Sequence, residues 1–197
     1  GEVKLNLTKM MKSKEKAVTI LTKGVEFLFK KNKVTYFKGV GSFKSRNEIL
    51  ITDNKNNQTI ISADKTVIAT GSVPSTMPGI EFDEKIIVSS TGALNLNQVP
   101  KKMIIVGGGY IGLEMGSVWS RLGAEVHVIE FLDHITPGMD LEISKEFMKI
   151  LKKQGIFFHM ETKVENIKNN KDFAILNVLT KDGKKREIQT NVVLISI

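Results

Sequence analysis

The sequence predicts an α/β protein in which a parallel β-sheet is combined with helices and antiparallel strands. Three observations favour this class. The apolar run 103–106 ends in a cluster of glycines and is followed by a helix-compatible segment to Leu122. A second apolar run, 124–129, comes directly after it, as in a β-α-β unit. The final run, 192–197, is apolar almost throughout, which is typical of a strand buried on both faces.

The first half of the chain is predicted to hold one long helix and several short strands. Residues 7–33 form the helix, because Val18, Leu21, Val25 and Leu28 repeat at helical spacing. The stretch from Pro74 to Pro100 holds three of the four prolines, and residues 75–100 are predicted to be an irregular connection between two domains. Strands are expected at 34–40, 48–52, 58–62 and 66–69.

The second half is predicted to be a nearly complete doubly wound domain. A second helix covers 140–153, with Pro137 just before it and Gly155 just after it. Connecting helices are expected to cover both faces of the parallel sheet, and tight polar turns predict a separate antiparallel meander. The domains are placed at 1–97 and 98–197. The parallel strands are 103–106, 124–129, 156–158 and 192–197, and the meander strands are 164–168, 173–179 and 185–189.

The glycine cluster has the spacing of a dinucleotide-binding turn, because Gly107, Gly109 and Gly112 match G-x-G-x-x-G. The first glycine permits a tight turn out of the strand. The second leaves room for a pyrophosphate, and the third lets helix and strand pack closely. The helix N-terminus then offers free N–H groups to the phosphates. Glu130 ends the next strand about 20 residues later, where an acid can bind the ribose hydroxyls, so we predict a Rossmann-like NAD site.

Composition excludes several functions. The net charge is +8, but only three of the basic residues are arginines, so the chain is poorly supplied for phosphate or base recognition and we expect no nucleic-acid partner. No apolar run approaches a membrane span. There are no cysteines, which excludes thiol chemistry within these residues. His127, His134 and His159 lie on three different segments without metal-ligand spacing, so we predict structural histidines and no metal site.

The two halves end alike, since each has a three-run β meander followed by a polar residue and an apolar strand. Only the second half carries the glycine turn. We therefore expect the matching turn of the first half before Gly1, a glycine just after Ile197, and a chain cut at both ends. An isolated chain of this kind should leave the run 66–69 without strand partners and its apolar surface open.

Several runs in the same order resemble the flavoprotein disulfide reductases, and among them the dihydrolipoamide dehydrogenases, over the whole chain. They are Ile68-Ala69-Thr70-Gly71-Ser72, Val88-Ser89-Ser90-Thr91-Gly92-Ala93-Leu94, the turn from Gly107 to Glu114, Ser117-Val118-Trp119, Arg121-Leu122-Gly123-Ala124-Glu125-Val126, and Glu130-Phe131-Leu132.

The resemblance implies FAD in the first domain, NAD in the second, and electron transfer from a dihydrolipoyl group through a cysteine pair and the flavin to NAD. Glu114 would lie near the reacting end as a supporting group, and Tyr110 near the flavin. Each also has an ordinary explanation, Glu114 as an acid in the first helical turn and Tyr110 as a cover for the turn. The implied FAD contacts are Gly41, Thr70, Gly71 and Ser72. The implied NAD contacts are Gly107, Gly108, Gly109, Tyr110, Ile111, Gly112, Leu113, Glu114, Glu130 and Val164.

The redox cysteines, the first FAD fingerprint, the later Gly-Asp FAD segment and the C-terminal catalytic His-Glu pair of the family are not in this sequence. We therefore expect the central, inactive portion of an enzyme that is a homodimer when complete. Its partner would be the dihydrolipoyl group of an acyltransferase or carrier protein in 2-oxo-acid dehydrogenase complexes, in the mitochondrial matrix or alternatively the cytoplasm. Other open interpretations are a mercuric reductase or transhydrogenase of the same class and a non-catalytic NAD-binding module.

Overall fold

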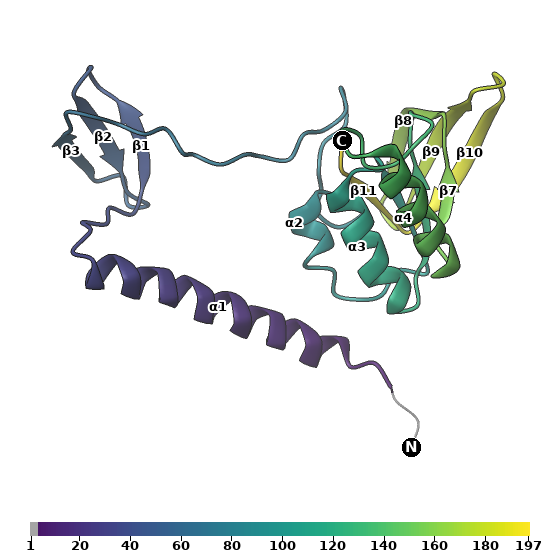
Figure 1. The fold of residues 1–197 in the computed structure, drawn as a ribbon, viewed down its shortest axis with the longest axis horizontal. Helices are drawn as coiled ribbons and strands as arrows, with labels where there is room; N and C mark the ends of the chain where they lie inside the picture. The colour runs from purple at the N-terminus through teal and green to yellow at the C-terminus, as the bar shows by residue number, and fades with distance from the viewer. Residues whose placement is uncertain (1–3) are drawn as a thin grey trace. The chain divides into compact units, whose positions relative to one another are not determined.

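The computed structural model describes residues 4–197 (Figure 1). Its contacts divide the chain into two compact units, each of which is described by itself. The N-terminal unit comprises residues 10–72. The C-terminal unit is built on residues 73–197 and also includes the described residues up to Lys9.

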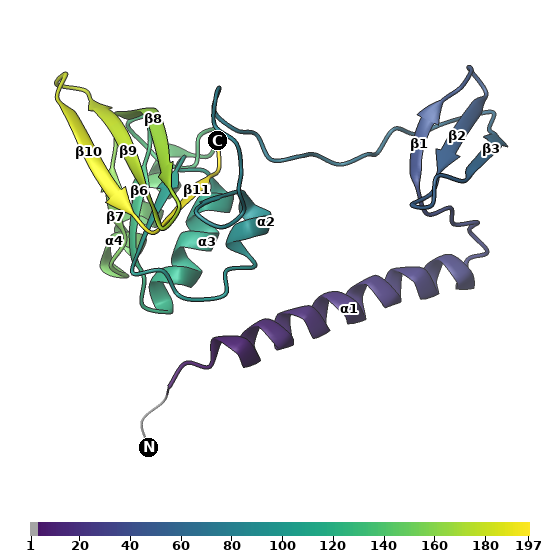
Figure 2. The ribbon, with the colours of Figure 1, turned by 180° about the vertical axis from the view of Figure 1, so that it is seen from behind.

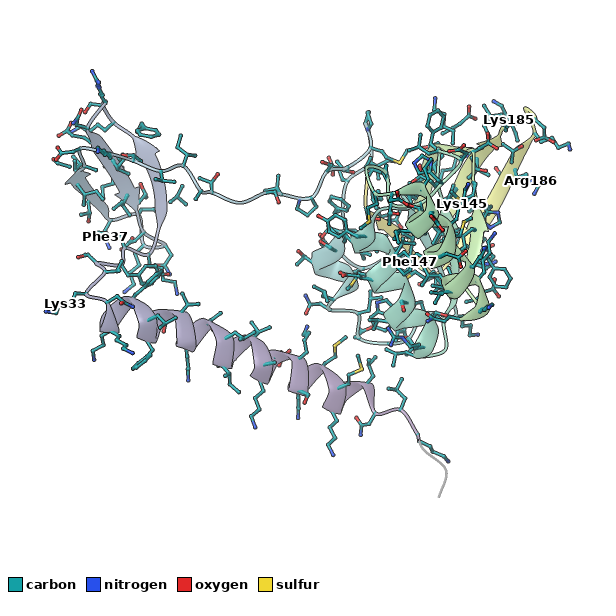
Figure 3. The ribbon with its side chains drawn as sticks, in the orientation of Figure 1. Lys33, Phe37, Lys145, Phe147, Lys185 and Arg186 are labelled. Carbon is teal, nitrogen blue, oxygen red and sulfur yellow. The ribbon has the colours of Figure 1, made fainter. Side chains whose placement is uncertain are left out.

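The N-terminal unit holds a helix and a three-stranded sheet. Helix α1 runs from Leu7 to Lys31, two residues short of the predicted end, and none of its residues is buried (Figure 3). The sheet has the antiparallel order β1-β2-β3, in agreement with the predicted meander. Among residues 4–197, no helix combines the length and the apolar character that crossing a bilayer demands. The strands are β1 Val40–Phe43, β2 Glu48–Thr52 and β3 Gln58–Ser62.

Two strand predictions in this unit are wrong. The expected strand at 34–40 is limited to its last residue, because pairing with β2 begins only at Val40, opposite Thr52. The run 66–69 forms no strand. Val67 is 87% exposed and Ile68 is 72% exposed, so this apolar segment has the open surface that was predicted, but as an unpaired chain and not as a sheet edge.

The C-terminal unit is organised around a five-stranded, fully parallel sheet of order β4-β11-β5-β6-β7. The four predicted parallel strands are all present and all parallel. The predicted meander is confirmed as the antiparallel sheet β8-β9-β10. The strands are β4 Ile87–Val88, β5 Lys102–Val106, β6 Glu125–Ile129, β7 Phe157–His159, β8 Thr162–Asn170, β9 Phe173–Thr180, β10 Lys185–Thr190 and β11 Val192–Ile195.

The helices cover one face of this sheet, and not both as predicted. Helices α3 (Tyr110–Arg121) and α4 (Leu141–Lys153) lie on the same side, since the Ser117 hydroxyl contacts the side chain of Gln154 at the end of α4 (Figure 1). The meander packs on the other face (Figure 2). The alternating apolar residues of the meander bury this second face of the parallel sheet, as α3 and α4 bury the first. This core combines Ile104, Val106, Ile129, Val193 and Ile195 of the parallel sheet with Val164, Ile167, Ala174, Leu176 and Val178 of the meander.

The connection expected at 75–100 is more regular than predicted. It contributes strand β4, which pairs with β11, and the short helix α2 (Ser90–Ala93). Both are too short to show a period in the sequence. Helix α2 is joined to α3 by Trp119, whose side chain is 2% exposed and whose indole N–H donates to the Ala93 carbonyl oxygen at 3.0 Å. The predicted boundary between an FAD-binding and an NAD-binding domain at residue 97 stays a prediction.

Candidate nucleotide-binding site

The glycine turn leaves strand β5 with the sharp geometry that the sequence predicts. Gly107 has φ +106°, in the region that favours glycine, and an added Cβ would stand 2.4 Å from the Ser196 carbonyl oxygen. Its N–H donates to the Ile129 carbonyl oxygen at 2.9 Å, which ties the turn to the end of β6. No other residue type fits Gly107 without moving the backbone of the strand beside it.

Gly112 brings helix α3 against the sheet. A Cβ there would lie 2.7 Å from Ile105 Cγ2 and 3.0 Å from the Gly107 carbonyl oxygen. Gly116, one turn further along, meets the same side chain, with Ile105 Cδ1 at 2.5 Å. Gly112 was predicted from the motif spacing, whereas Gly116 was not predicted. The four-residue spacing of the two glycines was the available signal, because residues four apart share one face of a helix.

The start of helix α3 is open where a pyrophosphate would approach. Gly109 is the N-cap, has no side chain to satisfy the first-turn N–H groups, and would place a Cβ 3.8 Å or more from every other group. Tyr110, 68% exposed, and Ile111, 40% exposed, begin the helix beside this space. Leu113, at 1% exposure, instead packs in the core, and its N–H donates to the Gly109 carbonyl oxygen at 3.1 Å, so the free first-turn N–H groups are those before it.

Glu130 connects the end of β6 to the glycine turn. Its side chain is largely buried, and one carboxylate oxygen, Oε2, accepts the Gly108 N–H at 2.6 Å. The other oxygen, Oε1, accepts the Leu132 N–H at 2.7 Å. Each carboxylate oxygen can accept a further hydrogen bond, so these contacts leave capacity for a ribose hydroxyl. Glu130 therefore shapes the turn as well as offering an acceptor.

A cavity of about 270 Å³ lies between the glycine turn and the meander. Its polar groups are few, and its walls are mainly apolar, as in many nucleotide pockets. Val164 lines it from β8, just before a bulge in the pairing with β9. The lining residues are Met77, Val106, Gly107, Ile129, Glu130, Phe131, Thr162, Lys163, Val164 and Ile197.

Glu114 lies on α3 one turn beyond Tyr110, and its side chain is exposed. The predicted FAD contacts are less closely gathered. Gly41 lies in β1 opposite Ile51, whereas Thr70, Gly71 and Ser72 lie in an extended exposed segment that follows β3. The described residues form no closed cradle around these four positions, so on their own they do not fit an FAD molecule.

Two of the histidines are neighbours, although they were predicted to lie on separate segments without a shared site. His127 Nδ1 and His159 Nε2 are 2.9 Å apart, across adjacent parallel strands, and His127 Nε2 lies 2.8 Å from Glu125 Oε1. Burial lowers the pKa of His159, and the charges of His127, Arg186 and Lys102 lower it further. Within residues 4–197, no three His, Asp or Glu side chains are grouped as metal ligands.

Comparison with known proteins places this arrangement in a family. The sequence model described as "Pyridine nucleotide-disulphide oxidoreductase" matches residues 3–197. The chain belongs to this family. Its mixed α/β fold agrees with a solved structure, the Cu(II) complex of the HOCl-induced flavoprotein disulfide reductase RclA from Escherichia coli. That similarity has a TM-score of 0.69 and 26% identity, and it covers 80% of this chain and 35% of that one.

Curated relatives define the resemblance more closely. Over 100% of this chain, identity is 54% to dihydrolipoamide dehydrogenase of Chaetomium thermophilum and 49% to mitochondrial dihydrolipoyl dehydrogenase of Pisum sativum. It is 48% to leghemoglobin reductase of Vigna unguiculata. The chain spans 40%, 39% and 38% of the lengths of these three proteins. The predicted resemblance to the dihydrolipoamide dehydrogenases over the whole chain is therefore confirmed.

Proposed function

We propose that the turn from Gly107 to Glu114, together with Glu130 and Val164, binds NAD(H). The observation that carries this proposal is the open N-cap at Gly109 beside the Glu130 carboxylate. Gly107 and Gly112 are packed tightly, so they form the turn, whereas the space around Gly109 is free for a ligand. N–H groups at a helix start attract phosphate, and a carboxylate at the end of the next strand is suited to ribose hydroxyls.

Each group then has a physical task. The first-turn N–H groups of α3 hold the pyrophosphate, and Glu130 orients the adenosine ribose. The cavity lined by Val164 excludes water from one side of the bound nucleotide. Tyr110 and Glu114, both exposed on α3, are our candidates for contact with the nicotinamide end. When bound, NAD supplies a hydride acceptor, and the chain supplies binding and orientation.

The test is titration of this chain with NADH, in parallel with a Gly109→Val variant. Gly109 has φ −73° and ψ 168°, which suits a β-branched residue, so the variant should keep its fold. The new side chain would occupy the space for the phosphates and abolish saturable binding. Gly24→Val is the matched control, at an exposed position of α1 with nothing within 4 Å. Absence of NADH binding by the unmodified chain, or equal binding by Gly109→Val, would refute the proposal.

At the level of the whole protein, we propose a dihydrolipoamide dehydrogenase that oxidises a protein-bound dihydrolipoyl group with NAD as final acceptor and FAD as second cofactor. Identity of about half over the full chain to such enzymes supports this. The proposed partners are acyltransferase or carrier proteins of 2-oxo-acid dehydrogenase complexes, and the proposed form is a homodimer. Mitochondrial relatives from Pisum sativum and Schizosaccharomyces pombe support a mitochondrial location.

An assay of the full-length protein separates this activity from the alternatives. Dihydrolipoamide oxidation coupled to NAD reduction should be fast, whereas mercuric-ion reduction and hydride exchange between NADPH and NAD should be slow. A full reading frame without a cysteine pair would instead favour a non-catalytic nucleotide-binding module.

A further inference from the structure

The loop between β6 and α4 contains a residue in an unusual backbone conformation. Thr136 has φ +51°, although it is β-branched and only 4% exposed. Left-handed φ values are disfavoured for such side chains, so the surrounding contacts must hold it there. The next residues form a turn, in which the Met139 N–H donates to the Thr136 carbonyl oxygen at 3.1 Å and Gly138 has φ +88°.

This conformation directs the Thr136 N–H to the glycine turn. It donates to the Gly108 carbonyl oxygen at 2.8 Å. The Gly108 N–H is held from the other side by Glu130 Oε2 at 2.6 Å. Both polar backbone groups of Gly108 are therefore fixed, and its carbonyl is turned into the protein, away from the space in front of Gly109.

A buried pair of hydroxyl groups anchors Thr136 in turn. Thr136 Oγ1 lies 2.7 Å from Ser144 Oγ, and Ser144 is 1% exposed in the first turns of α4. Thr136 Oγ1 also donates to the Ile135 carbonyl oxygen at 2.8 Å, so its single hydrogen is used and the Ser144 hydroxyl donates to it. The contacts thus run without a break from α4 through Thr136 to the peptide that precedes Gly109.

From this geometry we infer that Thr136 and Ser144 are positioning residues for the pyrophosphate of the nucleotide. They act through Gly108, without contacting the nucleotide, by keeping its carbonyl away from the phosphates so that the N–H groups that follow face them. The inference rests on the proposed NAD-binding function, because it concerns the same turn.

The test compares Thr136→Val with the unmodified chain. Valine keeps the size and branching of the side chain but removes the hydroxyl and leaves Ser144 Oγ without its buried partner. NADH and ADP should bind about threefold to tenfold more weakly, which is the usual range for one lost hydrogen bond. Adenosine, which has no phosphate, should bind as before. Thr136→Ser, which keeps the hydroxyl, should restore the affinity for NADH and ADP.

Three further variants separate positioning from stability. Ser144→Ala should weaken NADH binding as Thr136→Val does, and the double variant should be no weaker than either, because one contact is removed in all three. Thr190→Val is the matched control. Thr190 is a buried threonine whose hydroxyl donates to the Lys102 carbonyl oxygen at the start of β5, at the opposite end of the strand from the turn. It should lower the melting temperature without changing NADH affinity.

A nucleotide-free measurement tests the geometry independently. The amide ¹H–¹⁵N resonances of Gly108 and Gly109 should shift in Thr136→Val and keep their positions in Thr190→Val. Unchanged NADH affinity and unchanged resonances in Thr136→Val would overturn the inference and leave the proposed function intact. No NADH binding by the unmodified chain would overturn the proposed function, and the inference about the pyrophosphate with it.

Discussion

The Glu130 carboxylate accepts the Gly108 N–H at 2.6 Å, and so links the end of β6 to the middle of the glycine turn. The two residues are 22 positions apart, and both belong to the proposed NAD site. The Glu130 side chain thus has two roles, since it accepts a backbone N–H inside the protein and is also the proposed ribose-binding acid. Changes at Glu130 should therefore alter both the stability of the turn and the choice of nucleotide.

We predict that Glu130→Gln lowers the free energy of unfolding by about 1–3 kcal/mol, because an amide cannot accept from both Gly108 and Leu132 without turning its NH₂ group toward one of these donors. We also predict that the unmodified chain prefers NADH over NADPH by about 1–3 kcal/mol, since the carboxylate repels a 2′-phosphate, and that the variant loses most of this preference. Titration of the unmodified chain and of the Glu130→Gln variant with NADH and NADPH measures this preference. Glu142→Gln, an exposed change on α4, is the control. Equal affinities of the unmodified chain for the two nucleotides would contradict the prediction.

Gly112→Ala should be more damaging than Gly116→Ala. At Gly112 the added methyl group meets the Gly107 carbonyl oxygen at 3.0 Å and Ser196 Oγ at 2.4 Å, so the turn itself must move. At Gly116 the closest atom is the mobile end of Ile105, which can change rotamer. We expect a loss of about 1–3 kcal/mol for Gly112→Ala, with weaker NADH binding, and a smaller loss with unchanged binding for Gly116→Ala. Thermal denaturation measures the loss of stability in the two variants, and titration measures their NADH affinity. Equal effects of Gly112→Ala and Gly116→Ala would argue against the described packing.

Stability should fall on mild acidification because of His159. Burial lowers its pKa in the folded chain, so the unfolded chain binds protons more readily. The contribution of His159 to the free energy of unfolding is complete above the pKa of histidine in the unfolded chain, about 6.5. It is lost as the pH falls through the lower pKa of His159 in the folded chain. Urea denaturation between about pH 5 and pH 8 measures the slope, above the range in which Asp and Glu titrate. His159→Gln should flatten it, whereas His134→Gln should leave the His159 contribution in place. A slope that is the same with and without His159 would refute this assignment.

The 197-residue chain by itself should be colourless and inactive with dihydrolipoamide. It has no cysteine to exchange with a dithiol, and the residues Gly41 and 70–72 are exposed without forming a flavin cradle. The measurements are the visible flavin absorbance of the purified chain and NADH formation in the presence of dihydrolipoamide. A yellow preparation with one flavin per chain would show that these few contacts hold FAD after all.

The elements of residues 98–197 could be predicted because their signals are local and consistent. Glycine spacing, an apolar run on either side and a helix bounded by Pro137 and Gly155 all favour the same β-α-β arrangement. By contrast, the run 66–69 has strand composition but finds no partner, because a strand is stabilised by pairing as well as by residue type. Strand β4 has only two residues and depends on β11, more than one hundred positions away in the sequence.

The site could be predicted only as far as the motif extends. Gly107, Gly112 and Glu130 follow from spacing, whereas the contact of Thr136 with Gly108 depends on the path of a loop that has no motif. The neighbouring histidines are a similar case. His127 and His159 are 32 residues apart, and only the parallel pairing of β6 with β7 brings them together.

Trp119 is the only tryptophan of the chain, and its indole donates to Ala93 within residues 73–197. Its intrinsic fluorescence therefore provides an optical probe of one unit alone. Loss of the contact between α2 and α3 would move the indole from apolar surroundings into water and shift its emission to longer wavelengths. A two-step unfolding curve by circular dichroism, with a single step in tryptophan emission, would assign the coincident step to residues 73–197 and the other to residues 10–72.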